Sequence, residues 1–358
     1  MAPALLAAVV FFVVLFVVVC LVVLFVVMLC LLGGRVVLLC VHPVEGAPFR
    51  ASPDLTSRRT PASAGMGRHA LSERRCRPAV AIAYRRQVHE PHWIDLPGVV
   101  NMRDVGGLPT ESGDVVRFRR LLRSDNLQDL PAASVAALLE EFRLSDVIDL
   151  RTHVEVAKEG DGPLRATAVR HHHHSLYRED SDESGIPAAE RALPWEKDEA
   201  EAGVDRERRN GHHPSHEEFW SEHYLSYLSA RPDSVLAALH AVAASEGAAI
   251  VHCAAGKDRT GTIVGLALKI VGVPDELVIA DFAASAQKVA AILERLRARP
   301  AYADNLRHKT VAQQSPTTDT MRMLLGALQA RHGGVHGWLA SQGWTATDTE
   351  RMRRKLLG

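Results

Sequence analysis

Hydrophobic residues are distributed along this chain in three patterns that predict three kinds of structure. A continuous apolar run extends from Ala4 to Leu32 without a charged side chain. Residues 42–85 are rich in Pro, Ser, Arg and Ala and lack periodicity, so we expect a flexible linker over residues 35–87. After this linker, short apolar runs alternate with segments whose apolar residues recur every three or four positions, which predicts one folded domain over residues 88–358.

The N-terminal run predicts a transmembrane helix within residues 1–34. A helix rises ~1.5 Å per residue, so the run would span about 43 Å, more than the ~30 Å of a bilayer core. It is longer than the ~7–15-residue apolar segment of a signal peptide, and no basic residue precedes it. Arginines follow it from Arg35 onward, so the positive-inside rule places the folded domain in the cytoplasm. The alternative is a start of translation downstream, for example at Met66, which would give a soluble cytoplasmic protein.

The expected elements of the folded domain follow from the apolar spacing. Pro131 stands directly before one periodic segment, where proline favours the start of a helix. We expect strands over residues 99–102, 119–124, 145–150 and 169–176 and in the run that ends at Val251. We expect helices over residues 132–142, 217–228, 234–245 and 262–268 and in several segments up to the C-terminus. The alternation predicts an α/β fold with a central, mostly parallel sheet flanked by helices, in which ligands bind beyond the carboxyl ends of the strands.

Residues 178–216 interrupt this alternation. The segment is acidic and polar and contains several Gly and Pro residues. We expect an insertion that forms a solvated surface excursion; the alternative is a loop that covers the active site.

The composition excludes several classes of function. The chain has 42 basic and 42 acidic residues, so no basic excess points to nucleic acid. Five cysteines in 358 residues do not make a disulfide framework, and only Cys253 lies in a setting that suggests chemistry. Chemistry at that residue requires a reduced thiol, which suits the cytoplasm. The abundance of Ala, Val, Leu and Arg is typical of a bacterial protein from a GC-rich genome.

The ten residues from His252 to Gly261 carry the clearest chemical signal. Cys253 and Arg259 are separated by five residues, between a predicted strand and a predicted helix. In such a loop the backbone N–H groups and the helix N-terminus favour an anion, and the arginine offers a planar fork to two phosphate oxygens. The same positive surroundings favour a cysteine thiolate, which is a nucleophile. Neither a Walker A loop nor a dinucleotide-binding glycine pattern is present.

This loop resembles the signature of the protein-tyrosine phosphatase superfamily. Its second half, Gly256–Gly261, is similar to the atypical bacterial tyrosine phosphatases related to the secreted mycobacterial phosphatase PtpB. Further segments resemble elements of that family in the same order: Asn101–Leu108 its Asn-x-Arg-Asp-x-Gly-Gly element, Leu121–Leu127 its Arg-Ser strand, Val147–Arg151 with the following Glu155 its Asp-Leu-Arg strand end, and Gly333–Trp344 its closing helices. The resemblance covers about residues 90–358, and the segment near 178–216 has no counterpart.

The resemblance implies roles for the residues of the loop. Cys253 is the expected nucleophile, which forms a cysteinyl-phosphate that water then hydrolyses. Arg259 is expected to bind the phosphoryl oxygens, with the backbone N–H groups of Ala254, Ala255, Gly256 and Lys257. The Thr260 hydroxyl is expected to hydrogen-bond the thiolate. His252 is expected either to orient the cysteine or to pack at the strand end.

The general acid is not identified by a motif of its own. The Trp-Pro-Asp tripeptide of many tyrosine phosphatases is absent, and Leu193-Pro194-Trp195-Glu196 has the wrong order. The resemblance implies that Asp258 is the acid, with Asp149 in reserve; the alternative for Asp258 is a carboxylate that stabilises the loop by pairing with Arg259 or Lys257. It also implies that Lys257 accompanies activity on phosphoinositides; the alternative for Lys257 is a solvated surface side chain. Arg151 is expected to contact substrate or to hold Asp258.

Other functions remain open at this level. His171–His174 are contiguous and alternate between the faces of a strand, so they do not form a zinc site, and we expect no metal and no cofactor. The expected partner is a phosphorylated protein or a phosphoinositide. One alternative is a phosphate-binding module with little turnover. Another is a rhodanese-like sulfurtransferase, which also uses a loop cysteine.

Overall fold

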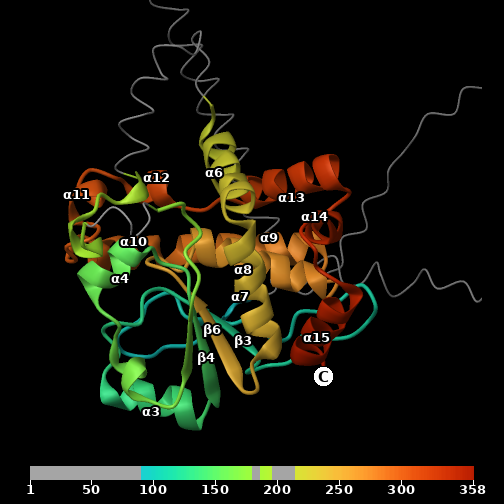
Figure 1. Cartoon of the computed structure of the whole chain (residues 1–358), viewed down its shortest axis with the longest axis horizontal. Helices are drawn as coiled ribbons and strands as arrows, with labels where there is room; N and C mark the ends of the chain where they lie inside the picture. The colour runs from blue at the N-terminus through green and yellow to red at the C-terminus, as the bar shows by residue number, and fades with distance from the viewer. Residues whose placement is uncertain (1–89, 180–185, 196–213) are drawn as a thin grey trace, which may run out of the picture. The chain divides into compact units, whose positions relative to one another are not determined.

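The computed structural model describes residues 90–179, 186–195 and 214–358. These residues form a six-stranded sheet with helices on both faces (Figure 1). The strand order is β1 (His92–Trp93), β2 (Arg103–Asp104), β3 (Leu121–Ser124), β6 (Ala248–His252), β4 (Leu144–Asp149) and β5 (Arg170–His173). The last four are parallel, whereas β1 and β2 join antiparallel at one edge. The predicted mostly parallel α/β sheet is therefore confirmed for this part of the chain.

The transmembrane helix and linker predicted for residues 1–87 lie outside the described residues. Within residues 90–179, 186–195 and 214–358, no helix is both long and apolar enough to cross a membrane.

Strand β6 occupies the centre of the sheet because its first four residues are apolar and its whole length is buried. It pairs with β3 on one side and with β4 on the other, so that His252 lies opposite both Ser124 and Asp149. The carboxyl ends of the three strands therefore meet at one edge, and the loop that begins at Cys253 leaves the sheet there.

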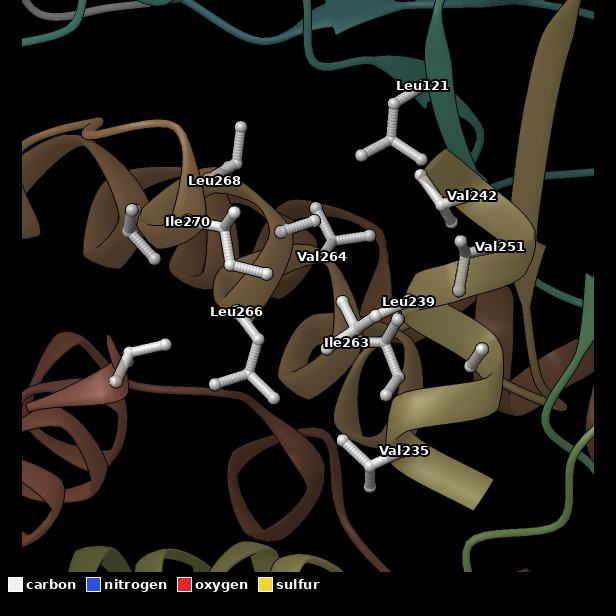
Figure 2. Packing of buried hydrophobic residues seen from close by; sticks show 14 of the residues in the cluster. Leu121, Val235, Leu239, Val242, Val251, Ile263, Val264, Leu266, Leu268 and Ile270 are labelled. Carbon is white, nitrogen blue, oxygen red and sulfur yellow. The ribbon is translucent and has the colours of Figure 1, made fainter. Parts of the chain in front are cut away.

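Two hydrophobic clusters cover the two faces of the sheet. On one face, Val251 and Leu121 pack among residues of α7 (Pro232–Ala244) and α8 (Asp258–Ile270), as Figure 2 shows. On the other face, Ile250 packs with residues of α3 (Ala132–Glu140). The period of two along β6 thus sends alternate side chains into separate cores.

The remaining helices group around this framework. On the α8 side lie α6 (His216–Ala230), α9 (Asp275–Ala284), α13 (Thr318–His332), α14 (Val335–Ser341) and α15 (Ala346–Leu356). A third cluster joins the loop after β6 to α10 (Val289–Arg297) and α11 (Ala303–Leu306). The shorter elements are α4 (His153–Glu159), α12 (Val311–Gln314) and the 3₁₀ turns η2 (Pro163–Ala166), η4 (Ala188–Glu190) and η5 (Ser285–Lys288).

One predicted strand is wrong, and several predicted boundaries differ from the structure; the strand expected over residues 169–176, for example, ends at His173. Residues 99–102 are not a strand, because the N–H groups of Val100 and Asn101 donate to the Asp125 carboxylate instead of to a neighbouring strand. The strand begins only at Arg103. Helix α8 begins at Asp258, four residues before the predicted start at residue 262, so Asp258 and Arg259 both lie in its first turn.

Candidate active site

The loop after β6 is closely fitted to the strand beside it. Cys253 is a free thiol with only 2% of its surface exposed. Gly256 has φ +67°, and a Cβ at this position would collide with the Ser124 carbonyl group of β3. Only glycine combines a favourable positive φ with the absence of a Cβ, so the turn of the loop at this position requires Gly256.

The carbonyl groups of the loop are held from outside. The Asn126 N–H donates to the Ala254 oxygen at 3.0 Å, the Asn101 side-chain amide to the Ala255 oxygen at 2.9 Å, and Arg123 to the Gly256 oxygen at 2.9 Å. The described hydrogen bonds include none donated by the backbone N–H groups of residues 254–257. These N–H groups and the first turn of α8 are available to an anion.

Arg259 is held in place by a buried carboxylate. Its guanidinium makes two hydrogen bonds with Glu155, at 2.5 and 2.9 Å, and Tyr302 donates to the same carboxylate at 2.9 Å. Burial would raise the pKa of Glu155, but the charge and hydrogen bonds of Arg259 outweigh this effect and lower it. Glu155 therefore carries a negative charge that fixes the arginine fork.

Asp258 is paired rather than free. Lys257 donates to its two oxygens at 2.9 and 2.7 Å, and the Tyr224 hydroxyl donates to one of them at 2.5 Å. Burial favours the neutral acid, but the charge and hydrogen bond of Lys257 and the hydrogen bond of Tyr224 prevail, so the pKa of Asp258 lies below its ordinary value. Without a ligand, Asp258 is a carboxylate at neutral pH.

Lys257 is buried and does not extend into solvent. It is 4% exposed, and its ammonium group lies 4.7 Å from the centre of the Trp220 ring. Its positive charge is thus directed to Asp258 and to the aromatic face of α6.

Arg151, Asp149 and His252 form a second buried group at the strand ends. Arg151 makes a forked contact with Asp149, including an Nη2–Oδ2 bond of 2.6 Å, and has no contact with Asp258. Asp258 is held by Lys257 and Tyr224 instead. The His252 ring lies 3.6 Å from Asp149, and burial lowers the pKa of His252 to about 4, so this histidine is neutral at pH 7.

Thr260 is fully buried beside the loop. Its hydroxyl has no hydrogen-bond partner among the described residues. The predicted bond from this hydroxyl to the thiolate therefore stays a prediction.

Aromatic rings enclose the arginine. The Arg259 guanidinium lies 5.5 Å from the Tyr177 ring and 5.9 Å from the Trp195 ring, and Trp195 stacks on Tyr302. Trp195 belongs to the insertion for which we expected a solvated excursion. Among residues 186–195 of this insertion, Leu193 is buried and Trp195 packs at the site, whereas Ile186 is exposed. Residues 180–185 and 196–213 lie outside the described part.

The histidines of β5 bond protein groups. His172 lies 2.8 Å from the Asp146 carboxylate and His173 lies 2.7 Å from the Arg151 carbonyl oxygen. In the described part of the chain, no group of three His, Cys, Asp or Glu side chains is arranged to hold a metal ion.

Several residues of the site were not predicted as functional, among them Glu155, Tyr224 and Trp195. Glu155 follows Thr152 at the spacing of a capping box, which is visible in the sequence, but its bond to Arg259 is not. Tyr224 lies on an amphipathic helix, where an aromatic residue ordinarily indicates core. Trp195 belongs to the tetrapeptide that was set aside for its order.

The sequence of this chain is similar to those of known enzymes. The sequence model of the tyrosine phosphatase family matches residues 94–358. The triple specificity protein phosphatase PtpB of Mycobacterium tuberculosis (strain ATCC 25618 / H37Rv) is 30% identical over 286 residues, covering 74% of this chain and 99% of PtpB. A tyrosine-protein phosphatase of Nostoc commune is 28% identical over 148 residues, covering 38% of this chain and 48% of that protein.

Proposed function

Because the chain belongs to the tyrosine phosphatase family, we propose that it hydrolyses phosphotyrosine through a cysteinyl-phosphate on Cys253. The observation that carries the proposal is the loop itself. Its carbonyl groups are bonded from outside, its N–H groups are free for an anion, and Glu155 holds the Arg259 fork beside the buried thiol. This arrangement suits the charge that spreads over the phosphoryl oxygens in the transition state.

The reaction proceeds in two displacements. The Cys253 thiolate attacks phosphorus, the bond from phosphorus to the tyrosine oxygen breaks, and that oxygen takes a proton from Asp258. Water then attacks the cysteinyl-phosphate, Asp258 receives a proton from it, and inorganic phosphate leaves with the thiolate restored.

Asp258 needs a proton before it acts as the acid. In the free site Lys257 keeps it ionised. A phosphate dianion in the loop adds negative charge beside the carboxylate and attracts the Lys257 ammonium, and both effects favour uptake of a proton by Asp258. Asp149 is less suited to this role, because His252 and Arg151 outweigh the effect of burial and lower its pKa further than that of Asp258.

The substrate range extends in our proposal to phosphoserine, phosphothreonine and phosphoinositides. The name of the mycobacterial relative, a triple specificity phosphatase, supports a wide range. Lys257 supplies a cation for a second phosphate group only if it leaves Asp258. The rings of Tyr177 and Trp195 beside Arg259 favour an aryl group, so we expect phosphotyrosine to be the best substrate.

The test is hydrolysis of p-nitrophenyl phosphate, a phosphotyrosine peptide and a phosphoinositide by the reduced chain and by Cys253→Ser. Turnover by the chain and none by the variant supports the proposal. A folded protein that binds phosphate without turnover would instead support the phosphate-binding module. Sulfur transfer from thiosulfate would support a rhodanese-like enzyme.

The acid is tested by Asp258→Ala. The variant should lose at least about 100-fold in kcat on phosphotyrosine, and less on p-nitrophenyl phosphate, whose leaving group needs little protonation. Equal losses on the two substrates would count against Asp258 as the acid.

We also propose that residues 1–34 anchor the enzyme to a membrane with its catalytic domain in the cytoplasm. Fractionation of cells that express the chain with and without these residues tests this. Equal recovery of both forms in the soluble fraction would contradict it.

A further inference from the structure

Two sequence motifs, Asn-x-Arg-Asp and Leu-Leu-Arg-Ser, supply no residue that acts on the phosphoryl group in the reaction above. The structure brings their arginines together, because Arg103 of β2 and Arg123 of β3 are paired residues in neighbouring strands. Both are fully buried, and the carboxylate of Asp281 from α9 lies between them. We propose that Arg123, fixed by Asp281 and Arg103, is a positioning residue that holds the phosphate loop in its anion-binding conformation. This inference rests on the proposed function of the loop.

Arg123 contacts both the Asp281 carboxylate and the phosphate loop. One nitrogen of its guanidinium donates to Asp281 at 2.5 Å. A second nitrogen, Nη2, donates to the Gly256 carbonyl at 2.9 Å, with the Lys257 carbonyl at 3.4 Å. The planar guanidinium thus connects a fixed carboxylate with the turn of the phosphate loop.

Fixing a carbonyl group also directs an N–H group. A trans peptide is planar, so its C=O and its N–H point in opposite directions. When Arg123 holds the Gly256 oxygen, the N–H of Lys257 is turned away from Arg123. Asn101 acts in the same way on the peptide that follows Ala255. The two motifs therefore orient successive N–H donors for the anion.

The group also contributes charge. Arg103 bonds Asp281 through Nε at 2.8 Å and donates to the Asp281 carbonyl at 2.6 Å. Burial lowers the pKa of Arg103 to about 10, so it stays protonated at neutral pH. Two arginines and one carboxylate leave one buried positive charge behind the loop, which attracts a phosphate dianion.

Stability alone is a poor explanation for this group. Buried ion pairs are costly to desolvate and often add little stability, and here the Arg123 Nε has no hydrogen-bond partner in the described part of the chain. The role of Arg123 in holding the phosphate loop explains why a charged guanidinium is buried in the core.

The experiment compares Arg123→Met and Arg123→Lys with the wild-type chain. Calorimetry measures the affinity for inorganic phosphate, circular dichroism the fold, and thermal unfolding the stability. We expect Arg123→Met to bind phosphate about 10-fold or more weakly. Arg123→Lys keeps the charge but not the fork, so it should recover only part of the affinity. In kinetics, the KM for p-nitrophenyl phosphate should rise with the same ranking.

Lys355→Met is the matched control. Lys355 is also a buried cation that donates to two backbone carbonyls, those of Ser245 and Gly247, but these precede β6 at the end opposite to the loop. The variant should unfold at a lower temperature and bind phosphate like wild type.

Two results would overturn the inference. One is a folded Arg123→Met or Arg123→Lys variant with unchanged phosphate affinity; if the methionine variant fails to fold, the lysine variant decides alone. The other is an equal loss of affinity in Lys355→Met. Phosphate binding needs no turnover, so a chain that binds phosphate through Arg123 but does not hydrolyse esters would contradict the proposed function and leave this inference standing.

Discussion

The carboxylate of Glu155 connects a helix start with the phosphate-binding arginine. One oxygen accepts the N–H of Thr152 at 2.7 Å as part of the α4 capping box, and both oxygens bond Arg259. Because Glu155 is fully buried, replacing it leaves an uncompensated guanidinium charge.

Glu155→Gln should therefore lower kcat/KM on p-nitrophenyl phosphate by about 100-fold, because Arg259 loses its fixed orientation. Glu159→Gln is the control. Glu159 lies on the same helix, its side chain is 1% exposed, and it also pairs with an arginine, Arg299, without a hydrogen bond or ion pair to Arg259. Steady-state kinetics and thermal unfolding are measured for both variants. An equal loss of activity in the two would contradict the role of Glu155.

Tyr224 controls the proton on Asp258. Its hydroxyl donates to the carboxylate and so favours the ionised form. Tyr224→Phe removes that bond, raises the pKa of Asp258 and should shift the falling limb of the pH profile of kcat/KM for phosphotyrosine to higher pH. Tyr227→Phe, which removes a hydroxyl bonded to Tyr177, should leave the limb in place. A limb that does not move in Tyr224→Phe would contradict this assignment.

At the scale of elements, the functional roles of residues close to Cys253 in the sequence were predictable, and those of residues distant in the sequence were not. The strand, loop and helix around Cys253 are continuous in sequence, so their function is visible in one motif. Glu155 and Tyr224 reach the loop only through the packing of α4 and α6, which no local pattern encodes. Residues 99–102 were mistaken for a strand because the Asp125 carboxylate takes the N–H groups that a ladder would use.

The position of Trp195, at the end of the described residues 186–195, can be tested by fluorescence. Trp195 lies beside Arg259, so its fluorescence should change when vanadate or phosphate occupies the loop. Trp195→Phe should abolish most of that change, and Trp344→Phe, whose ring stacks on His240, should retain it. A full signal in the Trp195 variant would place this ring outside the ligand's surroundings.

At the scale of the whole molecule, buried carboxylates make the fold sensitive to acid. Arg103 and Arg123 outweigh the effect of burial and lower the pKa of Asp281 from 3.8 to about 2. A carboxylate whose pKa is lower in the folded chain than in the unfolded chain stabilises the fold at pH values above the unfolded pKa. This contribution is lost as the pH falls from about 4 towards 2.

We therefore expect the midpoint of urea unfolding to fall steeply with pH over that interval. Asp281→Asn should be less stable at neutral pH and should lose less stability on acidification, because its amide does not titrate. Urea unfolding of both chains at a series of pH values measures this. Parallel curves would show that Asp281 is not the source of the acid sensitivity.

The supports of the phosphate loop also impose an order on its assembly. Asn101, Arg123 and Glu155 precede their partners in and beside the loop by 154, 133 and 104 residues. A ribosome releases them first, so the segments that hold the loop are already exposed when Cys253 emerges. Asp281, which locks Arg123, comes last. The nucleophile thus meets its completed binding site only after α9 has been synthesised, and a chain cut short before α9 would carry the signature motif and Arg123 without the carboxylate that fixes Arg123.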